Sequence, residues 1–361
     1  MNRVSMYAAI LAGGQGKRFW PYSRQNNPKQ FLDITGKGSM LSLTYKRLAE
    51  FIPPDRILIL TVKGMDSLIH EEIPDIPEDH IFIEPVGRNT APSLALAASA
   101  VLQIGGDFPI LCCPSDHLIR EADAFRRLIA TAADVAASHD ALVTFGIRPE
   151  HPSTGYGYIE AGPEALMKDG QRFCKVRSFH EKPDHRKAES YLKQGDFYWN
   201  SGIFIWRPSV FLSAWSRYLP EGKEPMEKIV DAFIRGKGRE AIEIEYHKMP
   251  SISVDYGILE NADNVLVAPA DLGWNDVGSW DALFDILEHN GDGNAISGYA
   301  EVIDSKGNLL FNPHGATAAV GIADLIVVVN EGTVLVCKRG LSQRVRELIE
   351  LMEQHGKDEL L

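Results

Sequence analysis

Short apolar runs of strand-forming residues alternate with longer segments of helical periodicity in the first half of the chain. The strand-like runs are Tyr7–Leu11, Arg56–Thr61, Phe108–Cys113 and Ala141–Gly146, and the helical segments are Met40–Phe51, Ala91–Ile104 and Ala124–Ala137. Strands that alternate with helices form βαβ units, in which the strands pair in parallel and helices cover both faces of the sheet. The pattern therefore predicts an α/β protein with a doubly wound sheet.

The last part of the chain has a different pattern. After about residue 290, glycine-punctuated strands follow one another at short intervals, as in AEVIDSKGNLLF, GIADLIVVV and GTVLVCKRG, which predicts a small β domain. The tail Leu341–Glu359 places Val345, Leu348, Ile349 and Met352 at helical spacing and is predicted to be an amphipathic docking helix. The 361 residues, 45% of them hydrophobic, suffice for one large core and one smaller core, so we predict two domains.

The charge balance excludes some classes of partner. Lys plus Arg number 37 against 49 Asp plus Glu, which gives a formal net charge of -12. A chain this acidic is not expected to bind nucleic acid or a membrane surface by general electrostatic attraction. Any anionic ligand must therefore be held by a local group of cations.

The cysteines and the apolar runs bear on the compartment. Cys112, Cys113, Cys174 and Cys337 form no C-x-x-C pair, which favours a reducing cytoplasm. No apolar run approaches the length of a transmembrane helix, and the first residues lack the apolar stretch of a signal peptide. We therefore expect a soluble cytoplasmic protein.

An apolar strand runs directly into a glycine turn in the segment AAILAGGQGKR, residues 8–18. A P-loop would need glycine in place of Leu11 and Ser or Thr in place of Arg18, and a dinucleotide fingerprint would need a third glycine where Phe19 stands. The turn matches neither motif. Small residues that let backbone N–H groups approach an anion, followed at once by Lys17 and Arg18, still predict a phosphate-binding turn of another kind.

Two further stretches place polar residues where predicted strands end. EPVGRNTAP (Glu84–Pro92) precedes an apolar helix, and CCPSDH (Cys112–His117) ends a buried strand. In an open α/β sheet, ligands bind at the carboxyl ends of the strands. Asn89 or Thr90 could equally be a helix N-cap, and Asp116 is either an N-cap or a ligand of a hard cation. The residues alone leave these alternatives open.

Three later stretches combine glycine, aromatic and charged residues. STGYGYIE, residues 153–160, is either a plain turn or a backbone surface open to a flat ligand. FHEKPD contains Glu181 next to Lys182, which by itself would be an ordinary solvated charge pair. GWNDVGSW sets Asp276 among aromatic residues and glycines, an unusual place for a surface carboxylate. A functional role is therefore favoured for Asp276.

Taken together, these stretches resemble the mannose-1-phosphate guanylyltransferases, also called GDP-mannose pyrophosphorylases, among the sugar-nucleotide pyrophosphorylases. The resemblance runs in family order through LAGGQGKRFWPYSRQNNPKQFL, EPVGRNTAP, PSDH, TFGIRPEHPSTGYGYIE, FHEKPD, WNSGIF, VDYGILE and WNDVGSW. It implies a Rossmann-like, doubly wound mixed sheet of the nucleotidyltransferase, glycosyltransferase-A-like type over residues 1–285. It also implies a small C-terminal domain resembling a left-handed β-helix, with a terminal helix, over residues 286–361.

The resemblance also implies roles for individual residues. Nucleotide-binding roles fall on Leu11, Ala12, Gly13, Gly14, Gly16, Lys17, Ser115, Glu84, Pro85, Arg88, Asn89 and Thr90, the last five beside guanine and ribose. Arg18 and Lys29 would bind the triphosphate and neutralise charge on the departing pyrophosphate. Asp116 and Asp276 would bind Mg²⁺ together with substrate phosphates. The sugar pocket would be lined by Gly157, Glu181, Asn200 and Asp255, with Lys182 close to the sugar phosphate.

The implied reaction is attack by a phosphate oxygen of mannose 1-phosphate on the α-phosphorus of GTP, which gives GDP-mannose and pyrophosphate without a nucleophilic side chain. Two alternatives stay open. One is a pyrophosphorylase for another sugar 1-phosphate or nucleoside triphosphate, since a few hydrogen bonds distinguish bases and sugars. The other is a non-catalytic regulatory subunit that senses nucleotide sugars. The presence of Arg18, Lys29, Asp116 and Asp276 favours an enzyme.

The sequence departs from the family pattern in places. Lys17, Phe19 and Tyr22 stand where the family signature has Thr, Leu and Leu, and His180 replaces a more usual apolar residue. Longer family members carry a cupin-type isomerase domain, and this chain ends before one, so the resemblance implies a single activity. The apolar strands of the small domain carry few charges, which predicts a surface covered by a second subunit and hence a homodimer.

Overall fold

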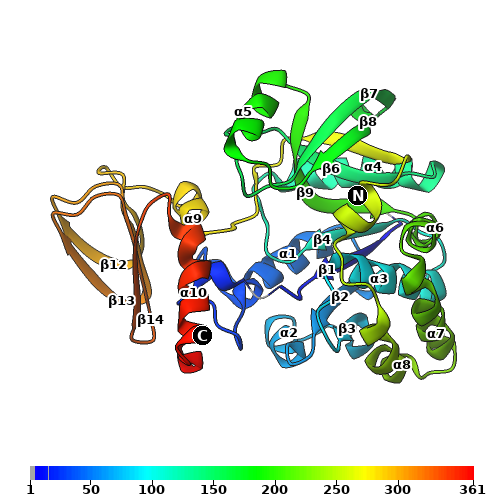
Figure 1. The fold of residues 1–361 in the computed structure, drawn as a ribbon, viewed down its shortest axis with the longest axis horizontal. Helices are drawn as coiled ribbons and strands as arrows, with labels where there is room; N and C mark the ends of the chain where they lie inside the picture. The colour runs from blue at the N-terminus through cyan, green and yellow to red at the C-terminus, as the bar shows by residue number, and fades with distance from the viewer. Residues whose placement is uncertain (1–4, 15) are drawn as a thin grey trace. The chain divides into compact units, whose positions relative to one another are not determined.

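The computed structural model describes residues 5–14 and 16–361, and its chain divides into two compact units (Figure 1). The first unit comprises the residues up to Gly13 together with Thr44–Ser115 and Ile119–Trp274. The second unit comprises Gly14–Leu43, Asp116–Leu118 and Asn275–Leu361. A single domain boundary near residue 285 stays a prediction, because these units are assembled from separate segments.

The first unit is built on a nine-stranded sheet with the order β3-β2-β1-β4-β9-β6-β10-β8-β7. Its strands are β1 Tyr7–Leu11, β2 Ile57–Val62, β3 Ile81–Glu84, β4 Ile110–Pro114, β6 Leu142–Ile147, β7 Tyr158–Lys168, β8 Gln171–His180, β9 Phe197–Trp206 and β10 Val265–Ala270. The strands β3, β2, β1 and β4 are parallel to one another, and β6 is parallel to β10. The short strands β5 Leu118–Ile119 and β11 Trp274–Asn275 lie outside this sheet.

The sheet is mixed, as the family resemblance implies. The strand β9 is antiparallel to β4, β6 and β7, and β7 and β8 form an antiparallel hairpin. A wholly parallel sheet, which the alternating pattern alone predicts, is therefore wrong. The reason is that β9 pairs with β7 of the hairpin and runs in the opposite direction to its neighbours β4 and β6. Hydrophobic periodicity does not encode strand direction.

The helices of the first unit are α1 Met40–Ala49, which begins in the second unit, α2 Asp66–Glu72, α3 Thr90–Ile104, α4 Ala122–Ser138, α5 His185–Gln194, α6 Pro208–Tyr218, α7 Lys223–Ile234 and α8 Gly238–Glu245. Of these, α1, α3 and α4 follow the predicted segments closely, and the other helices were not predicted. The helix α3 is apolar around its circumference and is buried from Ala91 to Val101. It can be buried all round because it packs on β1, β2 and β4 and also on α6 and α7 (Figure 1).

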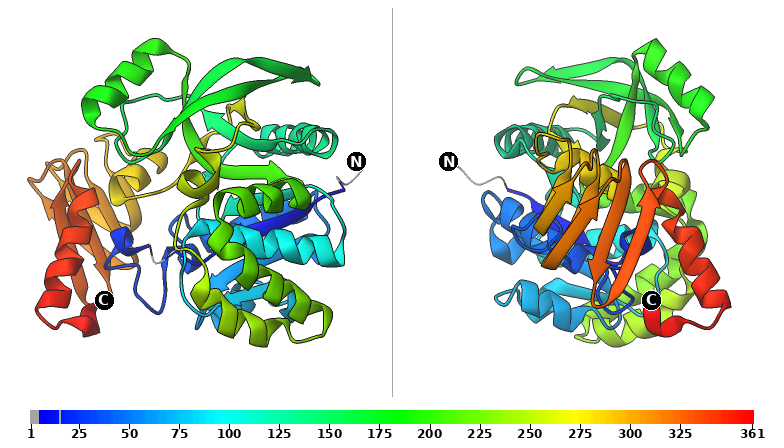
Figure 2. Two further views of the ribbon diagram at one scale, coloured as in Figure 1. Left: turned by 45° about the vertical axis from the view of Figure 1, so that its right-hand side comes forward. Right: turned by 90° about the vertical axis from the view of Figure 1, so that its left-hand side faces the viewer.

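The second unit contains a four-stranded sheet with the order β12-β13-β14-β15. These strands are β12 Ala295–Ile303, β13 Leu309–Val320, β14 Leu325–Asn330 and β15 Thr333–Lys338 (Figure 2). The first three are parallel, and β15 is antiparallel to β14. Inward-facing Phe311, Val328 and Leu335 pack against Phe19 and Trp20. The residues that follow the glycine turn are therefore anchored in the core of this unit.

Two helices complete that core, α9 Trp280–Ile286 and α10 Val345–Gln354. The predicted tail helix over Leu341–Glu359 is shorter in the structure, because Gly356 takes a left-handed conformation (φ 64°) just beyond the last turn. Among the described residues, no helix has the length and apolarity needed to cross a bilayer.

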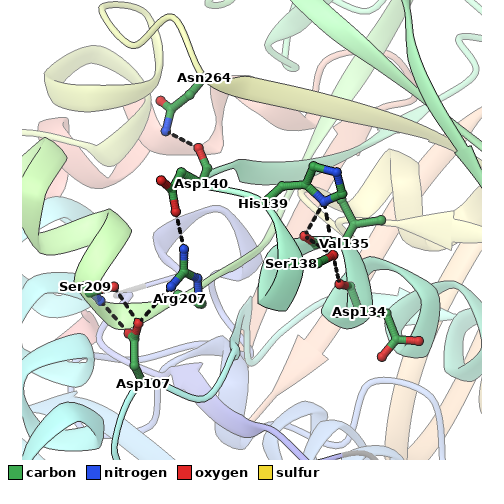
Figure 3. A network of polar contacts seen from close by, with 9 residues as sticks. All are labelled: Asp107, Asp134, Val135, Ser138, His139, Asp140, Arg207, Ser209 and Asn264. Carbon is green, nitrogen blue, oxygen red and sulfur yellow. Dashed lines mark hydrogen bonds and ion pairs between the residues drawn. The ribbon is translucent and has the colours of Figure 1, made fainter.

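A polar network fixes the amino-terminal ends of several strands in the first unit (Figure 3). Arg207, just after β9, donates to Asp107 before β4 and to Asp140 before β6. Asp107 also accepts from the backbone N–H of Ser209 at 2.8 Å, and Asn264 donates to the Asp140 carbonyl at 2.8 Å. Because ligands bind open α/β sheets at the opposite, carboxyl ends, this network holds the strands rather than a ligand.

Candidate active site

The carboxyl ends of β1 and β4 hold the predicted nucleotide-binding residues Leu11, Ala12, Gly13 and Ser115 in the first unit. The Ser115 N–H donates to the Leu11 carbonyl at 3.0 Å, and the Ala12 N–H donates to the Leu60 carbonyl at 2.8 Å. Thr44, which sequence reasoning missed, donates its hydroxyl to the Ser115 carbonyl at 3.0 Å. The backbone at this end of the sheet is therefore fixed by the neighbouring strand and by α1.

The chain passes from the first unit to the second within three predicted motifs. The passages lie at Gly13/Gly14 in the glycine turn, Ser115/Asp116 in PSDH and Trp274/Asn275 in GWNDVGSW. Each of these motifs therefore contributes residues to both units.

A buried lysine joins two of the predicted motifs within the second unit. Lys29 is only 4% exposed, and its ammonium donates to the Asp116 carboxylate (Oδ2) at 2.7 Å. The same nitrogen donates to the backbone carbonyls of Asp116 at 3.1 Å and Asp276 at 2.7 Å. The structure thus brings Lys29, Asp116 and Asp276 together at one point, although they lie far apart in the sequence.

The surroundings of Asp116 favour its charged form. Desolvation opposes ionisation, but Lys29 and His117 together with hydrogen bonds outweigh it, so the pKa of Asp116 lies below its ordinary value. The capping alternative for Asp116 is wrong, because the N-cap of α4 is Glu121. Asp276 accepts from the Gly278 N–H at 3.0 Å, which fixes its side chain within its own turn.

The carboxylates of Asp116 and Asp276 are of the chemical type that binds a hard divalent cation. Hard cations take oxygen ligands, and Mg²⁺ is commonly bound by one or two carboxylates and phosphates. Within residues 5–14 and 16–361, no group of three or more His, Cys, Asp or Glu side chains could hold a metal. A metal at Asp116 and Asp276 would therefore need oxygens from the substrate.

The turn after the glycines lies against Lys29. Gly16 has a φ of 58°, and a Cβ there would clash with the Lys29 side chain and lie 2.9 Å from its backbone nitrogen, so only glycine fits. Around Gly14, by contrast, a Cβ would meet no atom within 4 Å. Lys17 and Arg18 lie on the short 3-10 helix η1 Lys17–Phe19. Their side chains contact the C-terminal segment of the second unit.

The predicted base-binding segment links β3 to α3 in the first unit. Arg88 donates to the His247 carbonyl, and the Thr90 hydroxyl accepts from the Val254 N–H at 2.9 Å. Asn89 stands at the N-cap position of α3 but makes no side-chain capping bond, and Thr90 uses its hydroxyl outside the helix. The N-cap alternative is therefore right for the position of Asn89, although its side chain makes no capping bond. It is wrong for Thr90, which is the first residue of α3.

Glu84, next to Pro85, is buried at the end of β3. Its carboxyl group accepts from the Ser93 hydroxyl. Desolvation raises the pKa of Glu84 to about 7, although hydrogen bonds from Ser93 and Tyr246 act in the opposite direction. Sequence reasoning missed Tyr246, because nothing in its neighbourhood along the chain indicates that it faces Glu84.

The four predicted sugar-binding residues come together in the first unit. Asn200 donates its side-chain amide to Asp255 (Oδ1) at 2.7 Å, and its backbone N–H donates to the Gly157 carbonyl at 2.8 Å. A Cβ on Gly157 would clash with the Glu181 carboxylate. Lys182 forms an ion pair with Glu181 at 2.7 Å. The group offers carboxylate and amide oxygens suited to hydrogen bonds with sugar hydroxyls.

Comparisons with known proteins agree with this arrangement. The nucleotidyl transferase family model matches residues 7–292, and the MannoseP isomerase/GMP-like beta-helix domain model matches residues 299–352. A mannose-1-phosphate guanylyltransferase from Klebsiella pneumoniae is 37% identical over 97% of this chain and 74% of its own length. One from Escherichia coli K12 is 34% identical over 99% of this chain and 76% of its own length.

A solved structure is similar over almost the whole chain. The crystal structure of a mannose-1-phosphate geranyltransferase from Thermus thermophilus matches 98% of this chain and 100% of its own, with a TM-score of 0.86 at 30% identity. The chain belongs to the mannose-1-phosphate guanylyltransferase family. This confirms the family that the motifs indicate, and also the fold class, a Rossmann-like mixed sheet followed by a β-helix-like domain.

In this guanylyltransferase-family chain, strained backbone falls within three of the predicted motifs. Asn89, Lys182 and Val277 have φ values of 68°, 44° and 46°. Such conformations cost about 1–3 kcal/mol each for residues other than glycine, and they cluster at functional sites. Val277 directly follows Asp276, so the surrounding structure holds this carboxylate's turn in a strained conformation.

One member of the sugar group has a strongly shifted pKa. Desolvation is the main cause that raises the pKa of Asp255 to about 6, with Glu181 acting in the same direction and the Asn200 hydrogen bond acting against it. The neutral carboxyl group is thus favoured in the folded chain well above the pH at which an exposed aspartate ionises.

The unfolding free energy of this guanylyltransferase-family chain should depend on pH through Asp255. Because the folded pKa is raised, the stabilising contribution is complete below the unfolded pKa of about 4 and is lost as pH rises through about 6. The amide in Asp255→Asn does not ionise. The unfolding free energy of this variant, relative to that of the wild type, should therefore rise by up to about 3 kcal/mol between about pH 4 and pH 7. Urea denaturation at both pH values measures this, and a constant difference would contradict it.

Proposed function

We propose that this chain makes GDP-mannose and pyrophosphate from mannose 1-phosphate and GTP. The observation that carries the proposal is the group in which one buried ammonium, that of Lys29, contacts both Asp116 and Asp276. Two polyanions react in such a transfer, so cations and metal-binding carboxylates are the groups it needs. The choice of guanine and mannose is supported by the names of the similar proteins.

The chain's own residues bind and orient, and none acts as a nucleophile. A phosphate oxygen of mannose 1-phosphate attacks the α-phosphorus of GTP, a new P–O bond forms, and the bond from that phosphorus to the β-phosphate oxygen breaks as pyrophosphate leaves. Arg18 and Lys29 neutralise charge on the triphosphate and on the leaving group. The backbone at Gly13, Gly14 and Gly16 offers N–H groups to the nucleotide, and Leu11 and Ala12 lie beside it.

Asp116 and Asp276 are proposed to bind Mg²⁺. Bound there, the metal would supply charge neutralisation and orientation of phosphate oxygens. The lowered pKa of Asp116 supports this role, because a ligand of a hard cation must be ionised.

The remaining predicted residues are proposed to select the substrates. Gly157, Glu181, Asn200 and Asp255 hydrogen-bond the sugar hydroxyls, and Lys182 is near the sugar phosphate. Guanine and ribose are proposed to lie beside Pro85, Arg88, Asn89 and Thr90. In this loop the backbone of Asn89 is held in a strained conformation, which is typical of functional sites. Glu84 is already bonded to Ser93, which supports a role in holding that loop from inside.

Pyrophosphate release tests the proposal. The purified chain is incubated with Mg²⁺, mannose 1-phosphate and each of the four nucleoside triphosphates in turn, and then with GTP and other sugar 1-phosphates. Release that is fastest with GTP and mannose 1-phosphate supports the proposal. A different preferred pair would establish a sister pyrophosphorylase, and binding of GDP-mannose with no turnover would establish a regulatory subunit.

We also propose a cytoplasmic homodimer. The free thiols of all four cysteines support a reducing compartment. Several large apolar side chains on the second unit's sheet are more than half exposed, namely Tyr299 (62%), Ile303 (60%), Val320 (67%), Val334 (55%) and Val336 (58%). Exposed apolar surface of this kind is typical of subunit interfaces.

Light scattering tests the assembly. At micromolar concentration the mass should be twice that of the 40.0 kDa chain, and Val320→Lys with Val336→Lys should reduce it to that of the monomer. Lys228→Met, a change on the first unit's surface, serves as the control and should leave the mass unchanged. A monomeric wild type would contradict the proposal.

A further inference from the structure

The helix α10 packs directly against the turn that carries Lys17 and Arg18. Val345 and Ile349, on one face of α10, are each 3% exposed and belong to the same core cluster as Phe19 and Trp20. Both segments lie in the second unit. Apolar packing on the C-terminal helix therefore supports the turn.

The two cations of this turn are also held by side chains from the C-terminal segment. The Lys17 ammonium forms an ion pair with Glu353 (Oε1) at 2.8 Å, and Arg18 (Nη1) donates to Gln343 (Oε1) at 3.1 Å. Gln343 lies in the 3-10 turn Ser342–Arg344 just before α10, and Glu353 lies in the last turn of α10. The C-terminal segment thus contacts the turn twice, just before the first residue of α10 and in the last turn of α10.

Further contacts continue the same pattern along the chain. The Trp20 indole N–H donates to the Leu360 carbonyl at 2.7 Å, and Arg24 donates to the same carbonyl. Arg24 also donates to the Thr333 hydroxyl at 3.1 Å. Partners beyond residue 330 therefore fix four side chains of this segment, those of Lys17, Arg18, Trp20 and Arg24.

The two partners differ in charge, and the difference matters for phosphate binding. Gln343 is neutral, so it orients the Arg18 guanidinium without cancelling its charge. It engages one of the five N–H donors of a guanidinium, and the planar fork retains others for a phosphate. Glu353 is anionic and neutralises Lys17. The positive charge of the turn is thereby concentrated at Arg18.

We propose that Gln343 and Glu353 are positioning residues for the GTP-binding turn. They fix the rotamers of Arg18 and Lys17 before the triphosphate arrives, so that less side-chain freedom is lost on binding. The inference rests on the proposed function, because it assigns the turn to GTP. Both contacts are exposed, and exposed pairs contribute little to folding, so their loss should change GTP binding without unfolding the chain.

Kinetics on three variants tests the proposal. Gln343→Ala and Glu353→Gln should each raise the KM for GTP about 3- to 10-fold, with the KM for mannose 1-phosphate unchanged. In Glu353→Gln, the freedom that the exposed Lys17 side chain regains should outweigh the removal of a solvent-screened negative charge. The matched control is Glu350→Gln, the same substitution one turn earlier on α10, where the carboxylate pairs with Arg346 at 3.1 Å instead of with the turn. It should leave both KM values at the wild-type level.

A fourth variant separates orientation from charge. Gln343→Glu keeps an oxygen acceptor for Arg18 but adds a negative charge that competes with phosphate. Backbone hydrogen exchange of residues 16–24 should therefore stay as slow as in wild type, while GTP binds more weakly. In Gln343→Ala the same amides should exchange faster. The amides of α3 report on general folding and should not change in any variant.

Calorimetric titration with GTP alone makes the two proposals distinguishable. If wild type binds GTP but does not release pyrophosphate with mannose 1-phosphate, the proposed reaction fails while the positioning role is still measured by the GTP affinities. The positioning role is overturned if Gln343→Ala and Glu353→Gln bind GTP like Glu350→Gln, if both KM values change together, or if wild type does not bind GTP.

Discussion

Asp116→Asn and Asp276→Asn should each lower kcat by about two to three orders of magnitude and raise the Mg²⁺ concentration needed for half-maximal turnover. Asparagine keeps the size of the side chain and an oxygen acceptor but removes the negative charge that a hard cation requires. One ammonium, that of Lys29, contacts the Asp116 carboxylate and the backbone carbonyl of Asp276, so we expect the two residues to serve one ion. Turnover measured across a Mg²⁺ titration gives both quantities.

The double variant sharpens this test. Two ligands of one ion act as a unit, so the loss in Asp116→Asn/Asp276→Asn should be much smaller than the product of the single losses. Asp123→Asn is the control, because Asp123 is an exposed carboxylate in the first turn of α4 and pairs only locally with Arg126. Losses that multiply independently, or that do not depend on Mg²⁺, would rule out a shared metal.

The elements of the first unit could be predicted largely from periodicity. The run Tyr7–Leu11 has the bounds of β1, and the predicted segment Ala91–Ile104 differs from α3 only by Thr90. A helix or strand that buries one face, or all of its side chains, has a recognisable pattern of apolar residues. The presence of the element can therefore be predicted from the sequence. The direction of a strand in the sheet leaves no such pattern, and the antiparallel strand β9 lies outside the predicted runs.

The candidate site was predictable as a set of motifs but not as a set of contacts. Lys29 lies in the polar stretch QNNPKQ, which looks like a surface turn, yet it is buried because Asp116 and Asp276 reach it from distant segments. Tyr246 and Gln343 carry no local signal for the same reason. A side chain's partners depend on how remote segments pack, and a single sequence does not record that packing.

The structure decides between the two alternatives for Asp116, an N-cap and a metal ligand. From the sequence, an aspartate that follows a strand and precedes a helix fits an N-cap as well as a metal ligand. The structure places the short strand β5 between Asp116 and α4, so that Glu121 occupies the cap. With the N-cap alternative excluded, the prediction that Asp116 is a metal ligand remains, and the Mg²⁺ titration tests it.

Lys29→Met should reduce both turnover and stability. Its ammonium is buried and donates to the Asp116 carboxylate and to two backbone carbonyls. Removing one partner of a largely buried ion pair leaves the other charge uncompensated, which should cost about 2–4 kcal/mol of unfolding free energy here, because Asp116 is still 32% exposed. Loss of a charge-assisted contact to the leaving group should lower kcat/KM about 100-fold or more.

Adding Asp116→Asn to Lys29→Met separates these two effects. The uncharged amide no longer needs a counter-ion, so the double variant should recover part of the stability that Lys29→Met loses, as measured by its urea midpoint. It should recover no turnover, because the triphosphate still lacks its cation and the metal lacks a ligand. A double variant that regained turnover along with stability would mean that Lys29 serves only to neutralise Asp116 and that neither the cation nor the carboxylate is needed for the reaction. In that case the leaving-group charge must be neutralised by other residues, with Arg18 the first to examine.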